Sequence, residues 1–347
     1  MNTISVKSSI LLIYTGGTIG MKEDPADQAL KPFDFSQILE EVPELRKFAF
    51  KIDSYTFDPL IDSSDVEPGL WEALARLILR KYDEYDGFVI LHGTDTMAYS
   101  ASVLSFMLGG LGKPVIFTGS QLPIGSPRTD GKENLVSSIE IASAKDCNGR
   151  SVVPEVAIFF NSRLFRGNRT TKTDSSSFGA FSSPNYPPLA EAGISIRYNH
   201  GAIKKRRDGT PLEVRTELDT RVTILKIHPG ITRETTGYFL RDPGSRAVIM
   251  ETYGSGNAIS KPWFIDIVKE ACGKGKIILN VTQCQAGEVD MDIYATGKAL
   301  KAAGVISGRD ITTEAALGKL FCLMGKYPDN EDVKAALATE IEGEISE

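Results

Sequence analysis

The stretch ILLIYTGGTIG (residues 10–20) indicates the fold most strongly, because an apolar run ends abruptly in glycines and hydroxyl side chains. A short apolar run bounded by turn residues is typical of a strand buried on both faces. The same pattern returns in GFVILHGTDT (residues 87–96) and in PVIFTGSQ (residues 114–121). We therefore predict at least three buried strands that each end in glycine and hydroxyl residues.

Helical patterns separate these strands. Residues 67–81 and 97–108 have helical spacing, and in the first of them Asp65 is expected to cap the helix and Pro68 to occupy its first turn. A fourth strand is expected at residues 156–160. Strands that alternate with helices predict an α/β fold with a mostly parallel sheet covered on both sides.

The apolar signal weakens between Pro184 and Arg215, where prolines, glycines and a basic run gather. Strand and helix patterns then resume, with strands expected at residues 222–227, 247–251 and 276–281. We therefore predict two domains, since a single core rarely grows beyond roughly 250–300 residues. The expected division is a larger N-terminal catalytic α/β domain (residues 1–196), a linker (197–215) and a smaller C-terminal α/β domain (216–347).

Composition excludes several functional classes. The chain has 347 residues and a net charge of −6, which argues against a nucleic-acid-binding surface. No apolar run reaches the roughly 20 residues of a membrane span, and the N-terminal run is too short for a secretory signal. Four scattered cysteines show no metal-binding spacing. We expect a cytoplasmic protein that binds no metal and no cofactor, and that contacts neither nucleic acid nor membrane.

The three glycine-rich strand ends predict a common site. In open α/β sheets, ligands bind beyond the carboxyl ends of the strands. Glycines allow backbone amides to approach a developing oxyanion, and threonines such as Thr18 and Thr94 are candidate nucleophiles. Thr-Gly turns also occur where strands simply end, but three of them in one domain favour a small polar pocket.

A threonine nucleophile needs a base, and two candidates stand out. His92 precedes a glycine at a strand end and is best interpreted as a structural histidine. Lys172, in the segment RGNRTTKTD (residues 166–174), would be solvated if it stood alone. In a desolvated pocket beside Thr94 and Asp95 it becomes a candidate base, because desolvation favours the neutral amine. A dinucleotide site is not favoured, since Thr15 stands where the first glycine of its fingerprint is required.

These motifs resemble those of the bacterial L-asparaginase family, in particular its cytoplasmic type I group. The segments TGGTI (15–19) and LHGTDTM (91–97) match the two threonine motifs of the family. Residues 160–163, 166–172, 252–258 and 282–284 resemble further type I segments. The resemblance covers nearly the whole chain.

The resemblance implies a role for each matching residue. Thr18 would be the nucleophile, and Thr94, Asp95 and Lys172 would form a triad that activates either Thr18 or the attacking water. Asp95 would also pair with the α-ammonium group of L-asparagine, while the segment with Ser63 and Ser64 would hold the α-carboxylate. The Ser120 backbone carbonyl would accept from the leaving amide nitrogen. Asn257 would come from a neighbouring subunit of a homodimer or homotetramer.

The chain departs from the family pattern at two positions. Many relatives carry a tyrosine in the loop after the first motif, but this loop has none and the corresponding position is Leu30. Some type I enzymes bind asparagine as an effector through an arginine, where this chain has Glu251. We therefore expect no effector binding of that kind.

The predicted reaction is the hydrolysis of L-asparagine to L-aspartate and ammonia. Three alternatives remain open. The enzyme could act on glutamine as well as asparagine, because one methylene changes binding by only about 1–3 kcal/mol. The chain could instead be the asparaginase-like subunit of a tRNA-dependent amidotransferase, although those subunits carry an extra N-terminal domain. A binding protein without activity is disfavoured because all four reactive residues are present.

Overall fold

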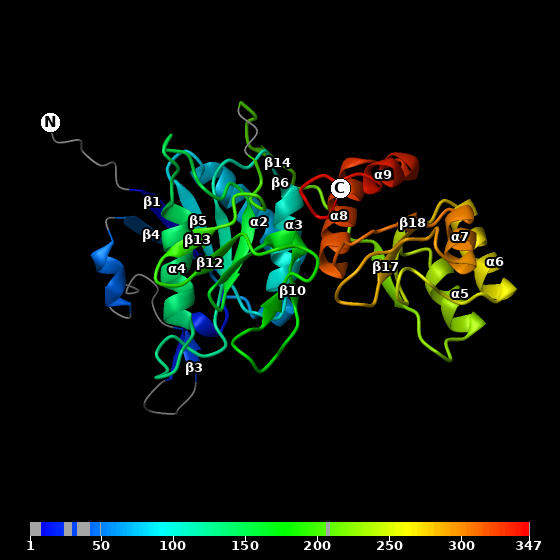
Figure 1. The fold of residues 1–347 in the computed structure, drawn as a ribbon, viewed down its shortest axis with the longest axis horizontal. Helices are drawn as coiled ribbons and strands as arrows, with labels where there is room; N and C mark the ends of the chain where they lie inside the picture. Colours follow the sequence, from blue (N-terminus) through cyan, green and yellow to red (C-terminus); the bar gives the residue numbers. More distant parts are fainter. Residues whose placement is uncertain (1–7, 24–29, 33–41, 49, 206–208, 347) are drawn as a thin grey trace. The chain divides into compact units, whose positions relative to one another are not determined.

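The computed structural model describes residues 8–23, 30–32, 42–48, 50–205 and 209–346. The chain divides into two compact units, Met1–Val214 and Arg215–Glu347. Each unit is an α/β fold, with a larger, mostly parallel sheet in the first and a smaller parallel sheet in the second (Figure 1). The predicted fold class is therefore confirmed.

The first unit is built on an eight-stranded sheet of order β13-β12-β9-β8-β7-β5-β1-β4. Five neighbouring strands are parallel and the other three are antiparallel. The parallel strands are β4 (Lys51–Thr56), β1 (Ser9–Tyr14), β5 (Gly87–Leu91), β7 (Val115–Thr118) and β8 (Val156–Phe160), and the antiparallel ones are β9 (Arg163–Arg166), β12 (Ala190–Ala192) and β13 (Ile196–Tyr198).

The strand order changes direction at β1. The chain passes from β1 to β4 on one side and then to β5 on the other. Such a switch point opens a crevice beyond the carboxyl ends of the two flanking strands. The two threonine motifs follow β1 and β5, so the topology brings them to this crevice.

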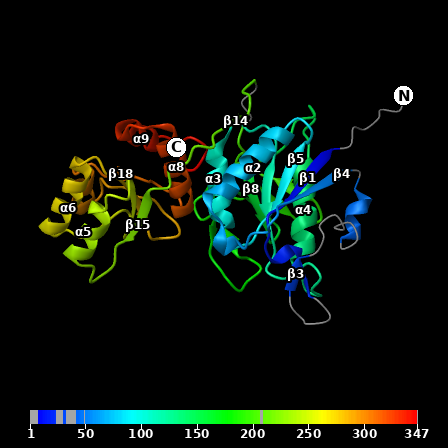
Figure 2. The same ribbon diagram turned by 180° about the vertical axis from the view of Figure 1, so that it is seen from behind.

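Helices cover both faces of the large sheet, with α4 (Gly131–Ser143) on one face and α2 (Pro68–Lys81) and α3 (Met97–Met107) on the other (Figures 1 and 2). The alternation within β1 explains this arrangement. Ile10 and Leu12 share a buried apolar cluster with Leu135 and Ile139 of α4, so the residues between them face the opposite side. The sequence analysis did not anticipate α4.

One predicted helix cap is wrong. The residue that caps α2 is Glu67, whose side chain makes no capping hydrogen bond, while Asp65 belongs to the short 3-10 turn η4 (Ser63–Asp65). Pro68 does occupy the start of α2, as predicted. Asp65 is therefore part of the loop that leads to the site and does not begin the helix.

Short elements complete the first unit. The expected linker, residues 197–215, contains the end of β13 and the strand β14 (Glu213–Val214), which pairs with β6 (Leu108–Gly109). Among the described residues, further strand pairs are β2 (Met21–Glu23) with β3 (Leu30–Pro32) and β10 (Thr171–Lys172) with β11 (Phe181–Ser182), and further 3-10 turns are η1 (Thr18–Gly20), η3 (Pro43–Lys47) and η5 (Gly167–Arg169).

The second unit has a four-stranded parallel sheet of order β15-β16-β17-β18. Its strands are β15 (Val222–Lys226), β16 (Ala247–Thr252), β17 (Ile277–Thr282) and β18 (Ile306–Ser307), and its helices are α5 (Arg233–Arg241), α6 (Pro262–Gly273), α7 (Ala295–Ala302), α8 (Thr313–Lys326) and α9 (Asn330–Leu337). Within the described residues, no helix of either unit has the length and apolar character that a membrane crossing requires.

Candidate active site

The loop after β1 presents Thr18. Gly16 and Gly17 have φ angles of 137° and 92°, which side-chain-bearing residues rarely adopt. A Cβ atom on Gly17 would lie only 2.5 Å from the amide nitrogen of Gly93. Only glycine therefore allows this loop to pack directly against the loop after β5. The half-buried Thr18 follows one residue later, beside the second threonine motif.

Tyr14, the last residue of β1, contacts this loop and stabilises it. Its hydroxyl donates to the Gly17 carbonyl at 3.3 Å, and its ring lies where a Cβ atom on Gly20 would stand. Burial raises the pKa of Tyr14 to about 12. The phenol therefore stays protonated and serves as a hydrogen-bond donor that supports the turn.

Thr94 and Asp95, on the loop after β5, lie in contact with Lys172 of β10. Lys172 Nζ donates to the Thr94 hydroxyl oxygen at 2.9 Å and to Asp95 Oδ1 at 2.7 Å. The Lys172 side chain is 19% exposed, whereas that of Asp95 is 64% exposed. The amine is thus largely shielded from water, and the carboxylate is open to a ligand. The predicted contact between Lys172, Thr94 and Asp95 is present in the structure, and their chemical roles remain predictions.

Four of the threonines at the strand ends fall into two groups. The amide and hydroxyl of Thr15 both donate to the Leu91 carbonyl, at 3.0 and 2.9 Å, and the buried Thr118 hydroxyl donates to the Phe159 carbonyl at 2.9 Å. These two threonines join neighbouring strands of the sheet. Thr18 and Thr94 are half-buried and follow the strands in the loops. They are therefore the better candidates for chemistry.

His92 is a structural residue. It is 1% exposed, its Nδ1 lies 2.7 Å from the Gly93 carbonyl, and its Nε2 lies 3.0 Å from the Ser100 hydroxyl. A carbonyl only accepts, so Nδ1 carries the proton and Nε2 accepts from Ser100. Burial lowers the pKa of His92 to about 4. Both ring nitrogens are occupied, which agrees with the sequence interpretation that His92 is not the base.

Ser63 and Ser64 lie on the turn η4, which is tied to the loop after β5. The Thr96 hydroxyl donates to the Ser63 carbonyl at 2.6 Å, and the buried Ser63 side chain fills the space that a Cβ atom on Gly93 would need. Ser64 is exposed, and its amide and hydroxyl each donate to Asp62 at 2.9 Å. These hydrogen bonds hold the pKa of the Asp62 carboxyl below its usual value. The turn is thus fixed beside Thr94.

Ser120, which follows β7, is 3% exposed, and its hydroxyl donates to the Leu122 carbonyl at 2.5 Å. Its hydroxyl is therefore engaged within the loop, which leaves the backbone as the part that a ligand would meet. The start of α4 fixes this loop, since Asp130 accepts from the Gln121 and Leu122 amides and Asn134 donates to the Gly119 carbonyl at 3.0 Å. The sequence analysis missed both supports, because α4 itself was not predicted.

Asn257 lies in the second unit, on the loop after β16. Its backbone amide donates to the Tyr253 carbonyl and its backbone carbonyl accepts from the Tyr253 amide, both at 2.8 Å, which forms an isolated antiparallel β-bridge. The loop is therefore a closed, ordered turn. A role for Asn257 in a neighbouring subunit remains a prediction.

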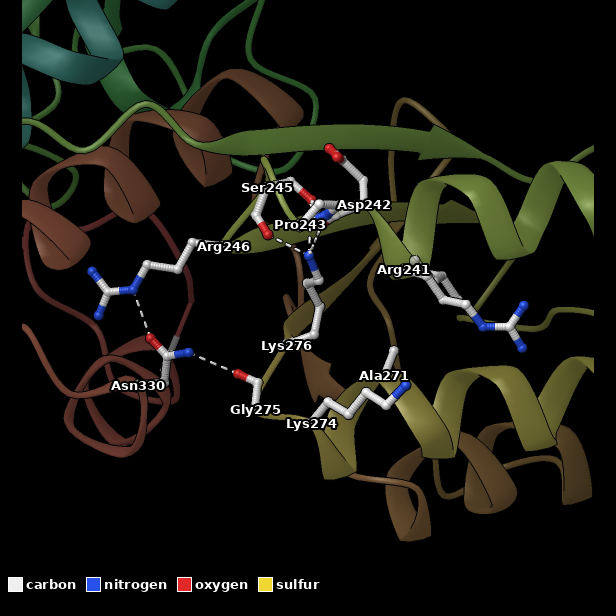
Figure 3. A pocket seen from close by; sticks show the side chains of 11 residues that line it. Arg241, Asp242, Pro243, Ser245, Arg246, Ala271, Lys274, Gly275, Lys276 and Asn330 are labelled. Carbon is white, nitrogen blue, oxygen red and sulfur yellow. Dashed lines mark hydrogen bonds between the residues drawn. The ribbon is translucent and has the colours of Figure 1, made fainter.

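Figure 3 shows a separate cavity of about 280 Å³ in the second unit. Its cationic lining suggests an anion site, but the half-buried cations Lys276 and Arg246 are already engaged. Lys276 donates to the Asp242 carbonyl, the Ser245 carbonyl and the Ser245 hydroxyl, which uses all three of its hydrogens. Arg246 likewise donates to Asn330, Asp219 and three backbone carbonyls. The lining stabilises the fold and leaves these donors no capacity for an anion.

Comparisons with known proteins follow the same two-part division. Residues 9–204 match the family model "Asparaginase, N-terminal", and residues 221–337 match "Glutaminase/Asparaginase C-terminal domain". The chain belongs to the asparaginase family. It is 44% identical to L-asparaginase 1 of Escherichia coli (strain K12) over 343 residues, which are 98% of each chain. This family membership confirms the resemblance inferred from the two threonine motifs.

Solved structures of the asparaginase family agree. The L-asparaginase I structure from Vibrio cholerae O1 biovar eltor superimposes with a TM-score of 0.88 at 42% identity, covering 98% of this chain and 99% of that one. A subunit of the glutamyl-tRNA(Gln) amidotransferase of Aeropyrum pernix is 34% identical, but the match covers 97% of this chain and only 79% of that longer protein. The similarity to the L-asparaginases of Escherichia coli and Vibrio cholerae extends over at least 98% of each chain.

Two positions depart from the family pattern. Leu30 begins β3, but its side chain and residues 24–29 of the loop lie outside the described residues. Glu251 accepts from the Thr313 hydroxyl at 2.8 Å and lies 3.7 Å from Lys226 Nζ. Glu251 is therefore engaged by a hydroxyl donor and lies near a cation within its own unit. The expectation that an asparagine effector is not bound in the same way stays a prediction.

Proposed function

We propose that this chain hydrolyses the side-chain amide of L-asparagine to L-aspartate and ammonia, with Thr18 as the nucleophile. The observation that carries this proposal is the short contact of Lys172 Nζ with Thr94 and Asp95, directly beside the Thr18 loop. Amide hydrolysis requires a nucleophile, a base, an oxyanion site and groups that hold both ends of a zwitterion. The residues around this loop provide candidates for each task.

In the first step the Thr18 hydroxyl oxygen attacks the carboxamide carbon, and its proton passes to the base. The tetrahedral intermediate collapses, the carbon–nitrogen bond breaks, and the nitrogen takes up a proton and leaves as ammonia. A water molecule then attacks the resulting ester, which releases L-aspartate and restores the Thr18 hydroxyl. The glycine-rich backbone around Gly17 supplies amides that can stabilise the oxyanion.

The trio of Lys172, Thr94 and Asp95 supplies the base. Lys172 Nζ accepts the proton in its neutral form and reaches the reacting group through the Thr94 hydroxyl. The Lys172 side chain is only 19% exposed, and its amine is oriented by the contacts with Thr94 and Asp95. The same trio serves in the second step, where the attacking water must lose a proton.

The ends of the substrate are held by separate loops. Asp95, which is more than half exposed, pairs with the α-ammonium group, while Ser63 and Ser64 hold the α-carboxylate. The Ser120 carbonyl accepts from the amide nitrogen. Because Asp95 would lose its partner, an N-acylated asparagine should bind poorly. Asn257 of a neighbouring subunit completes the site, which makes the active form a homodimer or homotetramer in the cytoplasm.

Activity toward glutamine is a second candidate. The match of residues 221–337 to a model shared by glutaminases and asparaginases supports it. The two substrates differ by one methylene, which changes binding by about 1–3 kcal/mol. The ratio of the two activities is therefore a matter of degree.

The deciding experiment is ammonia release with asparagine and glutamine, from micromolar to millimolar concentrations, by the wild type and Lys172→Met. We expect turnover of asparagine by the wild type and a loss of about a thousandfold in Lys172→Met. Lys145→Met is the matched control, since Lys145 also pairs with an aspartate, Asp86, at 2.6 Å but lies away from the Thr18 loop. No ammonia from either amide, or full activity of Lys172→Met, would refute the proposal.

A further inference from the structure

Lys172 is carried by a hairpin too short to define its own position. The hairpin consists of β10 and β11, in which Thr171 pairs with Ser182 and Lys172 pairs with Phe181. Isolated two-stranded hairpins are marginally stable even when they are longer. The long lysine side chain nevertheless reaches Thr94 and Asp95 at 2.9 and 2.7 Å. The position of Lys172 must therefore be set by contacts elsewhere.

Both strands of the hairpin connect to one cluster at its base. Arg169 comes two residues before β10 begins, and Tyr186 comes four residues after β11 ends. The Arg169 guanidinium lies 5.1 Å from the centre of the Tyr186 ring, and its Nη2 donates to the Asn185 carbonyl at 3.2 Å. These contacts join the incoming and outgoing strands of the Lys172 hairpin.

A second arginine fixes this cluster to the large sheet. The Arg166 guanidinium lies 4.4 Å from the centre of the same Tyr186 ring, and its Nε donates to Glu155 at 2.7 Å. The Arg166 side chain and the Tyr186 hydroxyl both donate to the Ala202 carbonyl, at 2.9 and 2.8 Å. Arg166 ends β9, and Glu155 directly precedes β8. The base of the hairpin is thereby tied to two strands of the sheet.

The two arginines of the cluster are almost fully shielded from water, and Tyr186 is half-buried. Arg166 is 6% exposed and Arg169 is 2% exposed. Cation–π contacts and charge-assisted hydrogen bonds gain strength when water is excluded. An anchor of this kind holds its geometry closely, which a catalytic side chain on a short hairpin needs.

We propose that Tyr186, together with Arg166 and Arg169, is a positioning residue that holds the Lys172 amine against Thr94 and Asp95. This inference rests on the proposed function, because it gives Lys172 the role of the base. Tyr186 touches no reacting atom in this scheme and acts only through the hairpin. Misplacement of a catalytic group by about 1 Å can cost about a hundredfold in rate.

The test begins with Tyr186→Leu and Tyr186→Phe. We expect Tyr186→Leu to lower kcat for asparagine by about 10- to 100-fold and to change KM by less than about threefold, since Ser63 and Asp95 lie on other loops. Tyr186→Phe keeps the ring over which both guanidinium groups lie and should recover most of the lost kcat.

Tyr82→Leu is the matched control, because Tyr82 is also half-buried, accepts from the Gly112 amide through its hydroxyl, and lies under a cation, Lys113 at 4.7 Å. A comparable fall of kcat in Tyr82→Leu would mean that general destabilisation is responsible, and would overturn the inference.

A double-mutant cycle separates this inference from the proposed function. In the Lys172→Met background, Tyr186→Leu should cause no further loss of kcat, because the residue that it positions is already absent. Equal losses in both backgrounds would show that Tyr186 acts independently of Lys172 and would overturn the inference alone. Full activity of Lys172→Met would instead overturn the proposed function. If Tyr186→Leu does not fold, Arg169→Lys enters the same cycle, since it keeps the charge but loses the planar guanidinium.

Discussion

The carboxyl edges of the two sheets carry similar residue types but differ in how those residues are used. Beyond the large sheet, Thr18, Thr94 and Asp95 lie in loops and are half-buried or exposed. At the carboxyl edge of the small sheet, Thr252 ends β16 and Asn280 lies within β17, and both are fully buried. The Thr252 hydroxyl donates to Asn280 Oδ1 at 2.6 Å, and Asn280 Nδ2 donates to the Gly256 carbonyl at 3.1 Å. Polar residues at strand ends therefore do not by themselves make a reactive site.

The physical difference is the capacity that remains for a ligand. In the small sheet Thr252 and Asn280 are paired within the protein, so their task is to fix the loop that presents Asn257. In the large sheet the Asp95 carboxylate is open to solvent, and Lys172 and Thr94 bond to each other at the edge of the crevice. Substitutions at the edge of the large sheet should therefore change catalysis, and those at the edge of the small sheet should change stability.

The largest effect is expected for Thr18→Ala. Removal of the hydroxyl removes the nucleophile, so kcat for asparagine should fall about a thousandfold, equivalent to about 4 kcal/mol, while the melting temperature stays close to that of the wild type. Steady-state ammonia release and thermal unfolding measure the two quantities. Thr18→Ser retains a hydroxyl and should keep substantial activity. Wild-type-like turnover by Thr18→Ala would move the nucleophile to another residue.

The next largest effect is on the pH dependence of stability and concerns His92, which is buried and has both ring nitrogens hydrogen-bonded. Its pKa is lowered from 6.5 to about 4, so the unfolded chain binds more protons than the folded one between these values. The stability that neutral His92 contributes is complete above pH 6.5 and is lost as the pH falls toward 4, by up to about 3 kcal/mol at roughly 1.4 kcal/mol per pH unit. Urea unfolding of the wild type and His92→Gln over this range should show a shallower pH dependence for the variant.

His228→Gln is the control for that measurement, because His228 is exposed. Its pH dependence should match that of the wild type. If His92→Gln and the wild type lose stability in parallel on acidification, the acid sensitivity comes from carboxylates alone and His92 is not the buried neutral group described above.

A smaller effect is expected when the two threonine loops are forced apart. In Gly17→Ala the new Cβ atom would lie 2.5 Å from the Gly93 amide nitrogen, so the Thr18 loop must shift and kcat should fall about tenfold. Gly149→Ala isolates the backbone strain, since Gly149 also has a positive φ, 75°, but no heavy atom lies within 4 Å of the added Cβ position. Gly149→Ala should lose about 1 kcal/mol of stability through backbone strain alone, Gly17→Ala should lose more because of the added close contact, and only Gly17→Ala should lose activity. If Gly17→Ala and Gly149→Ala have equal activities, the Gly17–Gly93 contact is not needed for catalysis.

The sequence predicted the strands of this reactive edge well for a physical reason. Buried parallel strands are continuous apolar runs, so β8 was predicted at the bounds that the structure shows, and β1, β5 and β7 were each predicted as buried strands from the stretches at residues 10–20, 87–96 and 114–121. Residue types made Lys172 a candidate base beside Thr94, and the family resemblance then joined these two segments, which lie 78 residues apart. Local patterns carry no information about such a separation.

The supports of the site were harder to predict. Asn134 and Asp130 belong to α4 and its start, and the α4 sequence GKENLVSSIEIAS mixes polar and small residues with its apolar stripe. Arg166 and Arg169 stand in a polar segment that is typical of solvated charges, yet both are almost fully buried around Tyr186. Burial of a charge depends on partners brought by the fold, here Glu155 and the Ala202 carbonyl. These contacts become visible only in three dimensions.

The smallest effect is expected at the edge of the small sheet. Thr252→Val keeps the shape of the side chain but removes the hydroxyl that donates to Asn280 Oδ1, which leaves a buried acceptor without this donor. The free energy of unfolding should fall by about 1 kcal/mol, measured by urea denaturation, and kcat should change by less than about twofold. Thr223→Val, on the half-buried strand β15, controls for the general effect of replacing a strand threonine by valine. A large fall of kcat in Thr252→Val would contradict this prediction. It would show that the small-sheet edge also takes part in catalysis, through the loop that presents Asn257.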